Sequence, residues 1–277
     1  TIPETSVDHW KETNDRVWLG EQFWANPMED WQVVNGAAEC QSLGANRNIH
    51  LITHELTDGK KPFEMSVRVG QIEVKGKDAG VGFRVGIQSD INEYRSNCFA
   101  GSGLNAGVDG DQIVLAGKRR ELKGEFDRTD FALHLSSNPG GEKTSLTLQV
   151  LNKEGHVVDS ILQSVPAEKL LGNIALINNF LPAKRRNQNT NQGGKASRYR
   201  FHQWSVTGDA FTVREERKFG PILWSMYSLS DSRSDEGFVL KMTALTGPLG
   251  AGDQQTVQLH IQKEGKWLAI SAGSNPG

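Results

Sequence analysis

The sequence predicts an all-β protein in which a large β-sandwich is followed by a smaller β-module. Runs of alternating apolar and polar side chains recur along the 277 residues, and this period-2 pattern is typical of strands with one buried face. Gly-rich turns separate the runs, and no segment between them is long enough to be a crossover helix. Apolar residues make up 36% and charged residues 23% of the chain, which is the composition of a compact globular protein.

The sandwich is expected to contain a long series of strands. They are predicted at 39–41, 49–54, 63–69, 82–87, 112–116, 131–135, 144–151, 157–161, 172–177 and 198–208. Asn152 to Gly155 has the composition of a hairpin turn between two of them, and Ala167 to Leu171 predicts a helical turn. Asp8 to Trp31 carries several tryptophans among polar residues, so we expect an irregular arm clamped onto a sheet.

The chain divides after the last strand of the sandwich. The tract 182–196 is predicted to be a loop because its centre is polar throughout, and the strand after it ends at Gly208. Residues 1–208 therefore form the predicted sandwich and 209–277 the second module, with strands at 222–227, 239–244, 257–262 and 267–270. An immunoglobulin-type sandwich usually has about seven strands, so we expect an immunoglobulin- or fibronectin-like module that is truncated.

Net charge and cysteine usage limit the partners. A formal charge of −2 gives no general attraction to phosphate backbones, so nucleic acid is not an expected partner. No stretch approaches the roughly 18 apolar residues of a membrane span. Cys40 and Cys98 are too few for a disulfide scaffold and are not spaced as a zinc or redox pair. They form one bridge or remain two buried free thiols.

No group of residues predicts catalysis or metal binding in this chain. His50 and His54 share a face of a predicted strand, but no third ligand completes a metal site, so we interpret them as a structural pair. Gly101 to Gly107 is interpreted as a turn-dense loop rather than a phosphate-binding loop, because no helix follows it. Acids that could pair for glycoside hydrolysis, or that are simply solvated charges, are Glu64, Glu73, Glu93 and Asp109.

Aromatic residues next to Asn and Arg give the candidate ligand site. Sugar-binding sandwiches place aromatic faces against pyranose rings and use polar side chains for hydrogen bonds. Tyr94, Arg95 and Asn97 follow a predicted turn with this composition, and Asn179 lies at the entrance to the Asn-rich tract. These four residues are the predicted ligand-binding set. The competing interpretation is that such aromatics belong to the core and such polar residues to ordinary loops.

Several segments resemble known families. Arg200 to Gly208 resembles the closing strand of laminin-G-like, concanavalin-type jelly rolls. Phe219 to Leu229, followed by Leu240 to Ala244 and Pro248 to Gly250, resembles the β-domain that precedes the catalytic region in alkaline phosphatase D-like metallophosphoesterases of exported bacterial proteins. Some larger members carry an extra sandwich that resembles Trp18 to Asn26 and Gly82 to Gly86 with Tyr94-Arg95.

The resemblance implies a phosphatase or phosphodiesterase whose metal centre is built from Asp, Asn and His. Two metals must activate water and clamp the phosphoryl oxygens together, and none of the motifs that would hold them occurs in this chain. The resemblance therefore implies a non-catalytic accessory region that binds a glycan or surface polymer and braces a downstream catalytic domain, where the catalytic metals would lie. It also implies an extracytoplasmic location, with the signal removed, and leaves a structural calcium ion open.

Two other functions remain open. The first is a self-sufficient jelly-roll enzyme that acts on a polysaccharide as a hydrolase or lyase, with paired acids or a Tyr/His/Arg set in a concave groove. The second is a structural spacer without a ligand. A groove lined by Tyr94, Arg95 and histidines would favour the enzyme.

Overall fold

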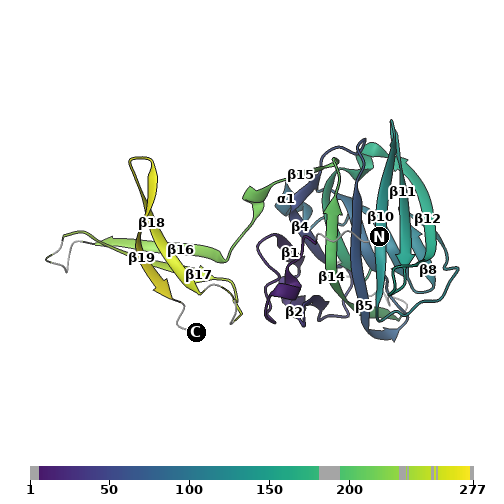
Figure 1. Cartoon of the computed structure of the whole chain (residues 1–277), viewed down its shortest axis with the longest axis horizontal. Helices are drawn as coiled ribbons and strands as arrows, with labels where there is room; N and C mark the ends of the chain where they lie inside the picture. Colours follow the sequence, from purple (N-terminus) through teal and green to yellow (C-terminus); the bar gives the residue numbers. More distant parts are fainter. Residues whose placement is uncertain are drawn as a thin grey trace.

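A computed structural model describes residues 6–180, 194–230, 235, 237–250, 253 and 255–274. Two stacked antiparallel sheets form a sandwich, and two pairs of strands extend beyond it toward the C-terminus (Figure 1). The predicted all-β jelly-roll sandwich is confirmed. Most of the tract predicted as a loop, from 182 to 193, lies outside the described residues. Among the described residues, none of the helices could span a membrane.

The first sheet is seven-stranded, in the order β12-β11-β10-β5-β14-β3-β2. Its strands are β2 (Trp31–Val34), β3 (Ala37–Cys40), β5 (Glu64–Gly76), β10 (Phe131–Gly140), β11 (Lys143–Leu151), β12 (Val157–Pro166) and β14 (Lys195–Thr207). The second sheet is eight-stranded, in the order β1-β4-β13-β6-β7-β8-β9, with β15 paired to β4. Its strands are β1 (Phe23–Asn26), β4 (Arg47–Leu56), β6 (Val81–Ile87), β7 (Leu104–Asp109), β8 (Gln112–Leu115), β9 (Lys118–Glu121), β13 (Gly172–Asn178) and β15 (Phe211–Val213).

Helical segments are short. They are η1 (Trp10–Glu12), η2 (Met28–Asp30), α1 (Tyr94–Asn97), η3 (Ala167–Leu170) and η4 (Glu215–Arg217). The segment η3 confirms the helical turn predicted after Pro166. The predicted hairpin turn at Asn152 to Gly155 is also present, because it joins β11 to β12.

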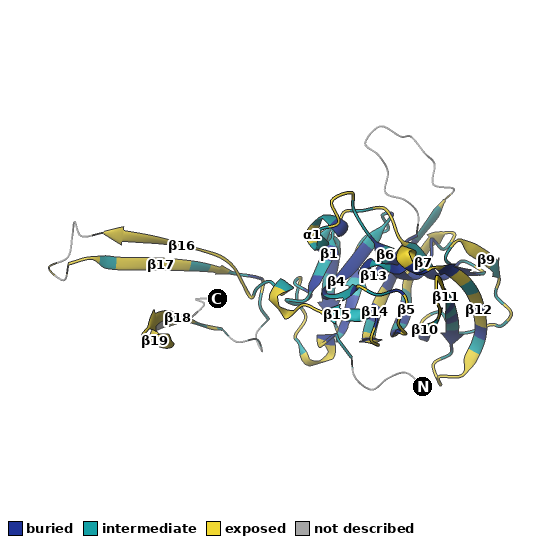
Figure 2. Ribbon diagram, turned by 90° about the horizontal axis from the view of Figure 1, so that it is seen from above, coloured by how far each residue is buried: buried dark blue, intermediate teal, exposed yellow. Residues whose placement is uncertain are grey.

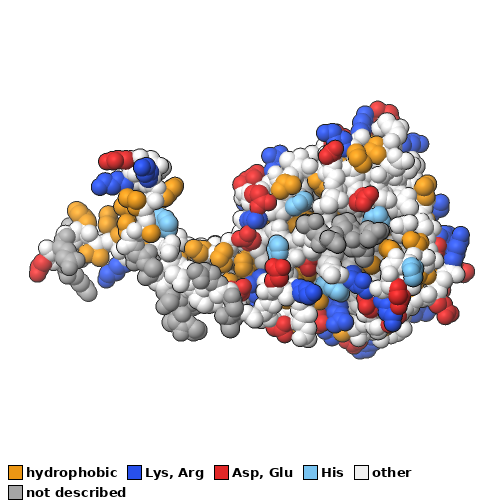
Figure 3. All heavy atoms as spheres, in the orientation of Figure 1, with side chains coloured by type: hydrophobic (Ala, Val, Ile, Leu, Met, Phe, Trp, Pro, Cys, Tyr) orange, Lys and Arg blue, Asp and Glu red, His pale blue; other side chains and the backbone are white. Residues whose placement is uncertain are grey.

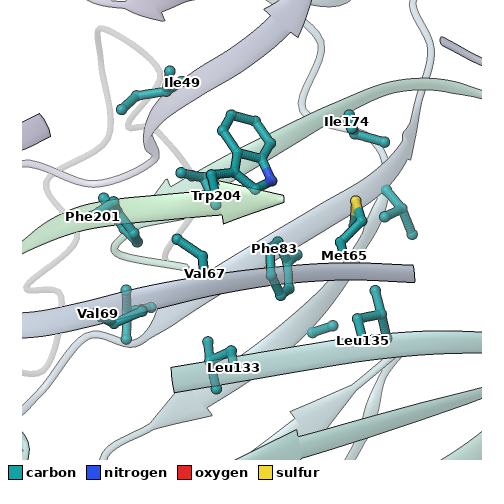
Figure 4. Close-up of a cluster of buried hydrophobic side chains, with 14 of the residues drawn as sticks. Ile49, Met65, Val67, Val69, Phe83, Leu133, Leu135, Ile174, Phe201 and Trp204 are labelled. Carbon is teal, nitrogen blue, oxygen red and sulfur yellow. The ribbon is translucent and has the colours of Figure 1, made fainter. Parts of the chain in front are cut away.

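The core lies between the two sheets and explains the alternation in the sequence. Val67 and Val69 of β5 and Phe201 of β14 point from one sheet toward Phe83 and Ile174 of the other (Figure 4). Each of these side chains is at most 1% exposed. Burial contributes roughly 1.5–3 kcal/mol for each fully enclosed large apolar side chain, so this layer is the main stabilising element of the sandwich.

The arm from Asp8 to Trp31 is more regular than predicted. It contributes β1, which pairs with β4, and its last residue, Trp31, begins β2. Trp10 and Trp31 are each only 1% exposed and belong to the core. The prediction that the arm is clamped onto the sandwich is therefore confirmed. The strand β1 was not predicted, because the tryptophans of the arm are separated by polar residues without a period-2 pattern.

The segment predicted as the loop Gly101 to Gly107 contains a strand. β7 begins at Leu104 and pairs with both β6 and β8. A Cβ atom on Gly107 would lie 2.0 Å from the Val81 carbonyl oxygen, so only glycine allows this approach of β7 to β6. The Gly-rich composition that predicts a loop is here a requirement of close strand packing.

The region beyond residue 209 holds the four predicted strands as two separate hairpins. β16 (Ile222–Ser230) pairs with β17 (Val239–Thr246), and β18 (Thr256–Lys263) pairs with β19 (Lys266–Ser274). Most residues of these hairpins are exposed (Figure 2). The division after Gly208 stays a prediction, and in the structure β15 still pairs with β4 of the sandwich.

Candidate functional site

Two of the four predicted ligand residues are buried and hold loops in place. Asn97 is 1% exposed; its Oδ1 accepts from the Ser89 backbone N–H at 2.8 Å, and its Nδ2 donates to the Asn173 Oδ1 at 3.2 Å. Asn179 is fully buried, has a φ of 72°, and donates its backbone N–H to the Gly80 carbonyl at 2.8 Å. A positive φ is adopted by Asn more readily than by other non-Gly residues, which explains its presence at this bend.

Tyr94 and Arg95 lie at the surface on α1, and their neighbours limit a stacking role. The Arg217 guanidinium carbon is 4.5 Å from the centroid of the Tyr94 ring, and that of Arg95 is 5.4 Å away. Arg95 also donates to the Glu93 carboxylate at 2.9 Å. The ring on which a sugar would stack therefore already has two cations beside it. The structure does not bring these two residues together with Asn179.

His50 and His54 both lie on a strand, β4, as predicted, but the register of β4 against β13 shifts between them, so they do not share a face through regular alternation. His50 is 1% exposed, and burial lowers its pKa to about 3, with the nearby Arg84 as a smaller cause. Its two ring nitrogens have no hydrogen-bond partner among the described residues. His54 is less buried, and its Nδ1 lies 3.0 Å from the Thr53 Oγ1. No group of three or more His, Cys, Asp or Glu side chains converges in the described part of the chain.

His50 and Arg84 occupy one row on the outer face of the eight-stranded sheet, on either side of Ala175. Arg84 donates to the Asn105 Oδ1 at 2.7 Å and to the Asn46 Oδ1 at 2.6 Å, and it is 6% exposed. Gly103 packs directly over it, since a Cβ there would lie 2.7 Å from the Arg84 Cγ. This His/Arg row is enclosed and does not line an open groove.

The acids considered for glycoside hydrolysis each contact a basic side chain or cap a helix. Glu73 pairs with Arg198 at 3.1 Å, Asp109 pairs with Arg119 at 2.6 Å, and Glu64 lies 3.4 Å from the His134 ring. Glu93 caps α1 by accepting from backbone N–H groups of its first turn. Glu64, Glu73 and Glu93 are exposed or partly exposed, as solvated charges would be, whereas Asp109 is only 7% exposed and is not a solvated charge.

Both cysteines are free and buried, which is one of the two alternatives left open by the sequence. Burial raises the pKa of each thiol to about 12. Cys40 belongs to the sandwich core, whereas Cys98 lies next to α1. Thiols with such a raised pKa are unreactive, so neither supplies a nucleophile.

An open polar cleft of about 700 Å³ lies on the outer face of the seven-stranded sheet. Three parts of the chain form it: the start of the arm, the turn between β2 and β3, and the neighbouring strands β5 and β14. The residues that line it are Ser6, Asp8, His9, Lys11, Glu12, Asn35, Gly36, Ala37, Arg68, Arg200, His202 and Gln203. We call this surface the polar cleft. Figure 3 shows that the face over β5 and β14 mixes Lys and Arg, Asp and Glu, and His side chains.

A β-bulge in β14 shapes the polar cleft. The register of β14 against β5 shifts between His202 and Ser205, and Gln203 has a φ of 52°. Asp8 binds the two amides of the bulge: the Trp204 N–H donates to its Oδ1 at 2.6 Å, and the Gln203 N–H donates to its Oδ2 at 3.2 Å. Bulges redirect side chains next to binding sites. Here the bulge places Trp204 in the core and leaves Gln203 exposed at the cleft.

The turn and the arm close the cleft on its other sides. Asn35 and Gly36 form the two-residue loop between β2 and β3, and both have a positive φ, as a tight hairpin turn requires. A Cβ on Gly36 would lie 3.0 Å from the Lys11 Cα, so the glycine lets the arm approach the turn. This contact positions Lys11 at the rim of the cleft.

The cleft residues offer both hydrogen-bond donors and acceptors. Guanidinium, ammonium and backbone N–H groups donate, whereas carbonyl and carboxylate oxygens accept. The sequence contained one signal for this site, because Arg200 and His202 alternate on the polar face of a predicted strand. It contained no signal that would place Lys11 and Asp8 beside them, since that contact joins residues far apart in the chain.

A smaller and more apolar cleft of about 290 Å³ lies between the arm and the C-terminal region. Trp10, Trp18, Leu249 and Arg16 are among its lining residues. Arg16 pairs there with Asp253 at 2.5 Å. The ion pair links the arm to the chain beyond the sandwich.

Comparisons with known proteins show similarity only among solved structures. No family model and no curated protein matches the chain. The seed lectin of Lotus tetragonolobus matches with a TM-score of 0.44 and 12% identity, over 70% of this chain and 93% of the lectin. An alginate lyase solved with an alginate trisaccharide matches with a TM-score of 0.40 and 12% identity, over 74% of this chain and 98% of the lyase. Arcelin-5, a lectin-like defence protein from Phaseolus vulgaris, matches with a TM-score of 0.43 and 7% identity, over 73% and 98%.

Proposed function

We propose that this protein is a non-catalytic carbohydrate-binding module that holds its ligand in the polar cleft. The observation that carries the proposal is the cleft itself, an open volume of about 700 Å³ lined by polar side chains from the arm, β5 and β14. Binding sites for small molecules usually have volumes of about 300–1,000 Å³ and converging polar groups. A saccharide needs such a surface because each of its hydroxyl groups both donates and accepts hydrogen bonds.

Rigid support distinguishes the cleft from an ordinary polar surface. Asp8 fixes the bulge of β14 through two backbone amides, and the Asn35-Gly36 turn rests against the arm. Preorganised side chains lose less conformational entropy when a ligand binds. In contrast, α1 presents Tyr94 with two cations beside its ring, so we place the glycan in the polar cleft rather than at α1.

The test is a binding screen of the purified chain against a glycan array, followed by affinity measurement for the glycans it retains. Arg200→Gln should weaken binding, because Arg200 lines the cleft, is exposed, and has no ion-pair partner in the described part of the chain. Arg95→Gln is the matched control, since Arg95 is also exposed but lies on α1. If no glycan binds, or if the control weakens binding as much as Arg200→Gln, the assignment is wrong.

The accessory role in an exported alkaline phosphatase D-like protein is proposed on the resemblance of Phe219 to Leu229 and the segments after it. We accordingly propose an extracytoplasmic location and a downstream catalytic domain as partner. The chain by itself should not hydrolyse a chromogenic phosphate ester with any divalent metal. Measurable metal-dependent hydrolysis by the purified chain would contradict this part of the proposal.

A further inference from the structure

The polar cleft carries more positive than negative charge that is free to meet a ligand. Lys11 and Arg200 are its cations without an ion-pair partner in the described part of the chain, whereas Arg68 pairs with Asp130 at 2.6 Å. Its negative groups are Asp8 and Glu12. The Asp8 carboxylate accepts hydrogen bonds from the amides of the bulge. The Glu12 carboxylate lies 3.6 Å from the His9 ring, and its side chain is 80% exposed. The whole chain has a formal charge of −2, so this local excess of cations is a property of the cleft and not of the protein.

Arg200 is the cation best placed for a ligand. Its backbone pairs with Gly70 of β5 on one side and with Glu39 of β3 on the other. A Cβ on Gly70 would lie 2.9 Å from the Arg200 Nε, so the guanidinium group lies over a strand position without a side chain. Arg200 is exposed and makes no ion pair with any described residue. An unpaired guanidinium offers a planar set of donors that suits carboxylate and sulfate oxygens.

Arg68 supports this arrangement but is already engaged. It lies opposite His202 across the β5–β14 pair. Its Nη2 donates to the Asp130 Oδ1 at 2.6 Å and to the Lys153 carbonyl at 3.2 Å. The Asp130 carboxylate therefore offsets the charge of Arg68, and Arg68 is not the group that receives the acidic group of the ligand.

His202 is influenced by the same cations. Its pKa is lowered first by burial, and next by the positive charges of Arg68, Arg200 and Lys11, with Asp130 acting in the opposite direction. No described residue makes a hydrogen bond with its ring. An anion placed among Arg200, Lys11 and His202 would offset the mutual repulsion of these groups, so its binding and the protonation of His202 would favour each other.

We propose that the polar cleft selects acidic saccharides and binds their carboxylate or sulfate group between Arg200, Lys11 and His202. The proposal rests on the proposed carbohydrate-binding function and specifies its ligand class. Hydroxyl groups of the same saccharide meet the neutral groups of the cleft, such as the Asn35-Gly36 turn and Gln203. Charge-assisted hydrogen bonds are about twice as strong as neutral ones, so the acidic group supplies the larger part of the selectivity.

The test compares polymers that differ only in their charged group. Polygalacturonate is compared with its fully methyl-esterified form, and dextran sulfate with dextran, by affinity electrophoresis and titration calorimetry on the whole chain. The acidic member of at least one pair should bind at least tenfold more tightly than its neutral partner, and the two pairs distinguish a carboxylate from a sulfate. Arg200→Gln should reduce that affinity about tenfold, whereas Arg95→Gln should leave it unchanged.

A second measurement follows His202 directly by NMR. Its pKa should rise when the acidic saccharide is added and should not change with the neutral partner. The thermal unfolding temperature of Arg200→Gln serves to show that the variant remains folded.

The outcomes separate the two proposals. If the neutral polymers bind as tightly as the acidic ones, carbohydrate binding stands and the selection of acidic groups is wrong. If Arg200→Gln and Arg95→Gln weaken binding equally, the effect is general electrostatic attraction, and the cleft is not the acidic site. If no saccharide binds, both proposals are overturned.

Discussion

Asp8 is predicted to be the residue that keeps the polar cleft in shape. Its carboxylate binds the N–H groups of Gln203 and Trp204, which the bulge removes from the ladder with β5. Trp204 is fully buried, whereas Gln203 is exposed. In Asp8→Ala, water can therefore satisfy the Gln203 amide but not the Trp204 amide.

The magnitude follows from that single orphaned amide. Leaving a buried donor without a partner costs about 1–3 kcal/mol, so the free energy of unfolding of Asp8→Ala should fall by about 2 kcal/mol. Asp8→Asn keeps one acceptor oxygen for Trp204 and should lose about 1 kcal/mol. Burial raises the pKa of Asp8, which means that the charged carboxylate carries a desolvation cost that the neutral amide avoids.

Urea denaturation at neutral pH measures both variants, and the glycan affinity of the folded variants is measured alongside. We expect the order wild type, Asp8→Asn, Asp8→Ala for both stability and affinity, because a relaxed bulge no longer holds His202 beside Arg200. A free energy of unfolding for Asp8→Ala within about 0.5 kcal/mol of wild type, the range of neutral surface substitutions, would refute the reasoning.

Three further predictions concern the rest of the molecule. Hydrogen bonds from Arg120 are the main reason that the pKa of Asp159 is lowered from 3.8 to about 2. The lowered pKa means that ionised Asp159 stabilises the folded state at pH values above its unfolded-state pKa. This contribution of about 2 kcal/mol should be lost as the pH falls from about 4 to about 2. Asp159→Asn should lack this pH-dependent step in acid denaturation, and an unchanged step would contradict it. Cys40 should resist thiol reagents in the native state, because burial raises its pKa to about 12, and should react only after unfolding; labelling without unfolding would show otherwise. Amide hydrogen exchange should be faster in β16–β19 than in β5 and β14, since isolated two-stranded sheets are at best marginally stable; equal protection would disprove this.

Much of the sandwich could be predicted from the sequence because its strands bury one face each. The alternation in β5, β10 and β11 follows directly from core residues such as Val67, Leu133 and Leu148, which are fully buried. The strands that were missed lack that pattern. β1 has only four residues, and its first three are all apolar, so it shows no alternation. β7 contains a glycine that close strand packing requires.

The candidate site was less predictable than the fold. Composition indicated Tyr94, Arg95, Asn97 and Asn179, but composition does not show whether an Asn side chain faces solvent or bonds to the backbone. Asn97 and Asn179 prove to be buried and to hold loops. The polar cleft instead depends on a bulge and on an arm that returns to β14, and neither leaves a local mark in the sequence.

The C-terminal hairpins raise a separate physical problem. Tyr227 and Leu229 of β16 face Met242 and Leu240 of β17 across the pair, and all four are at least 46% exposed. Figure 3 shows hydrophobic side chains gathered over this region. A two-stranded sheet needs further strands or a packing partner to be stable, so these exposed side chains leave each hairpin with little stabilisation of its own. The truncated module proposed for 209–277 stays a prediction.

The His/Arg row and the polar cleft lie on different sheets of the sandwich, and their surroundings explain why only the polar cleft is a candidate site. On the eight-stranded sheet, His50 and Arg84 lie on either side of Ala175 and are almost completely buried, and Gly103 packs against the Arg84 side chain. On the seven-stranded sheet, the bulge removes two amides from the ladder, and the arm must supply Asp8 to satisfy them. Because the arm is held at that point, it brings Lys11 to the outer face of the strands that carry Arg200 and His202. The bulge that removes two hydrogen bonds from the sheet is therefore also the feature that assembles the cleft. A variant that restored regular pairing of β14 with β5 should lose ligand binding while retaining the sandwich.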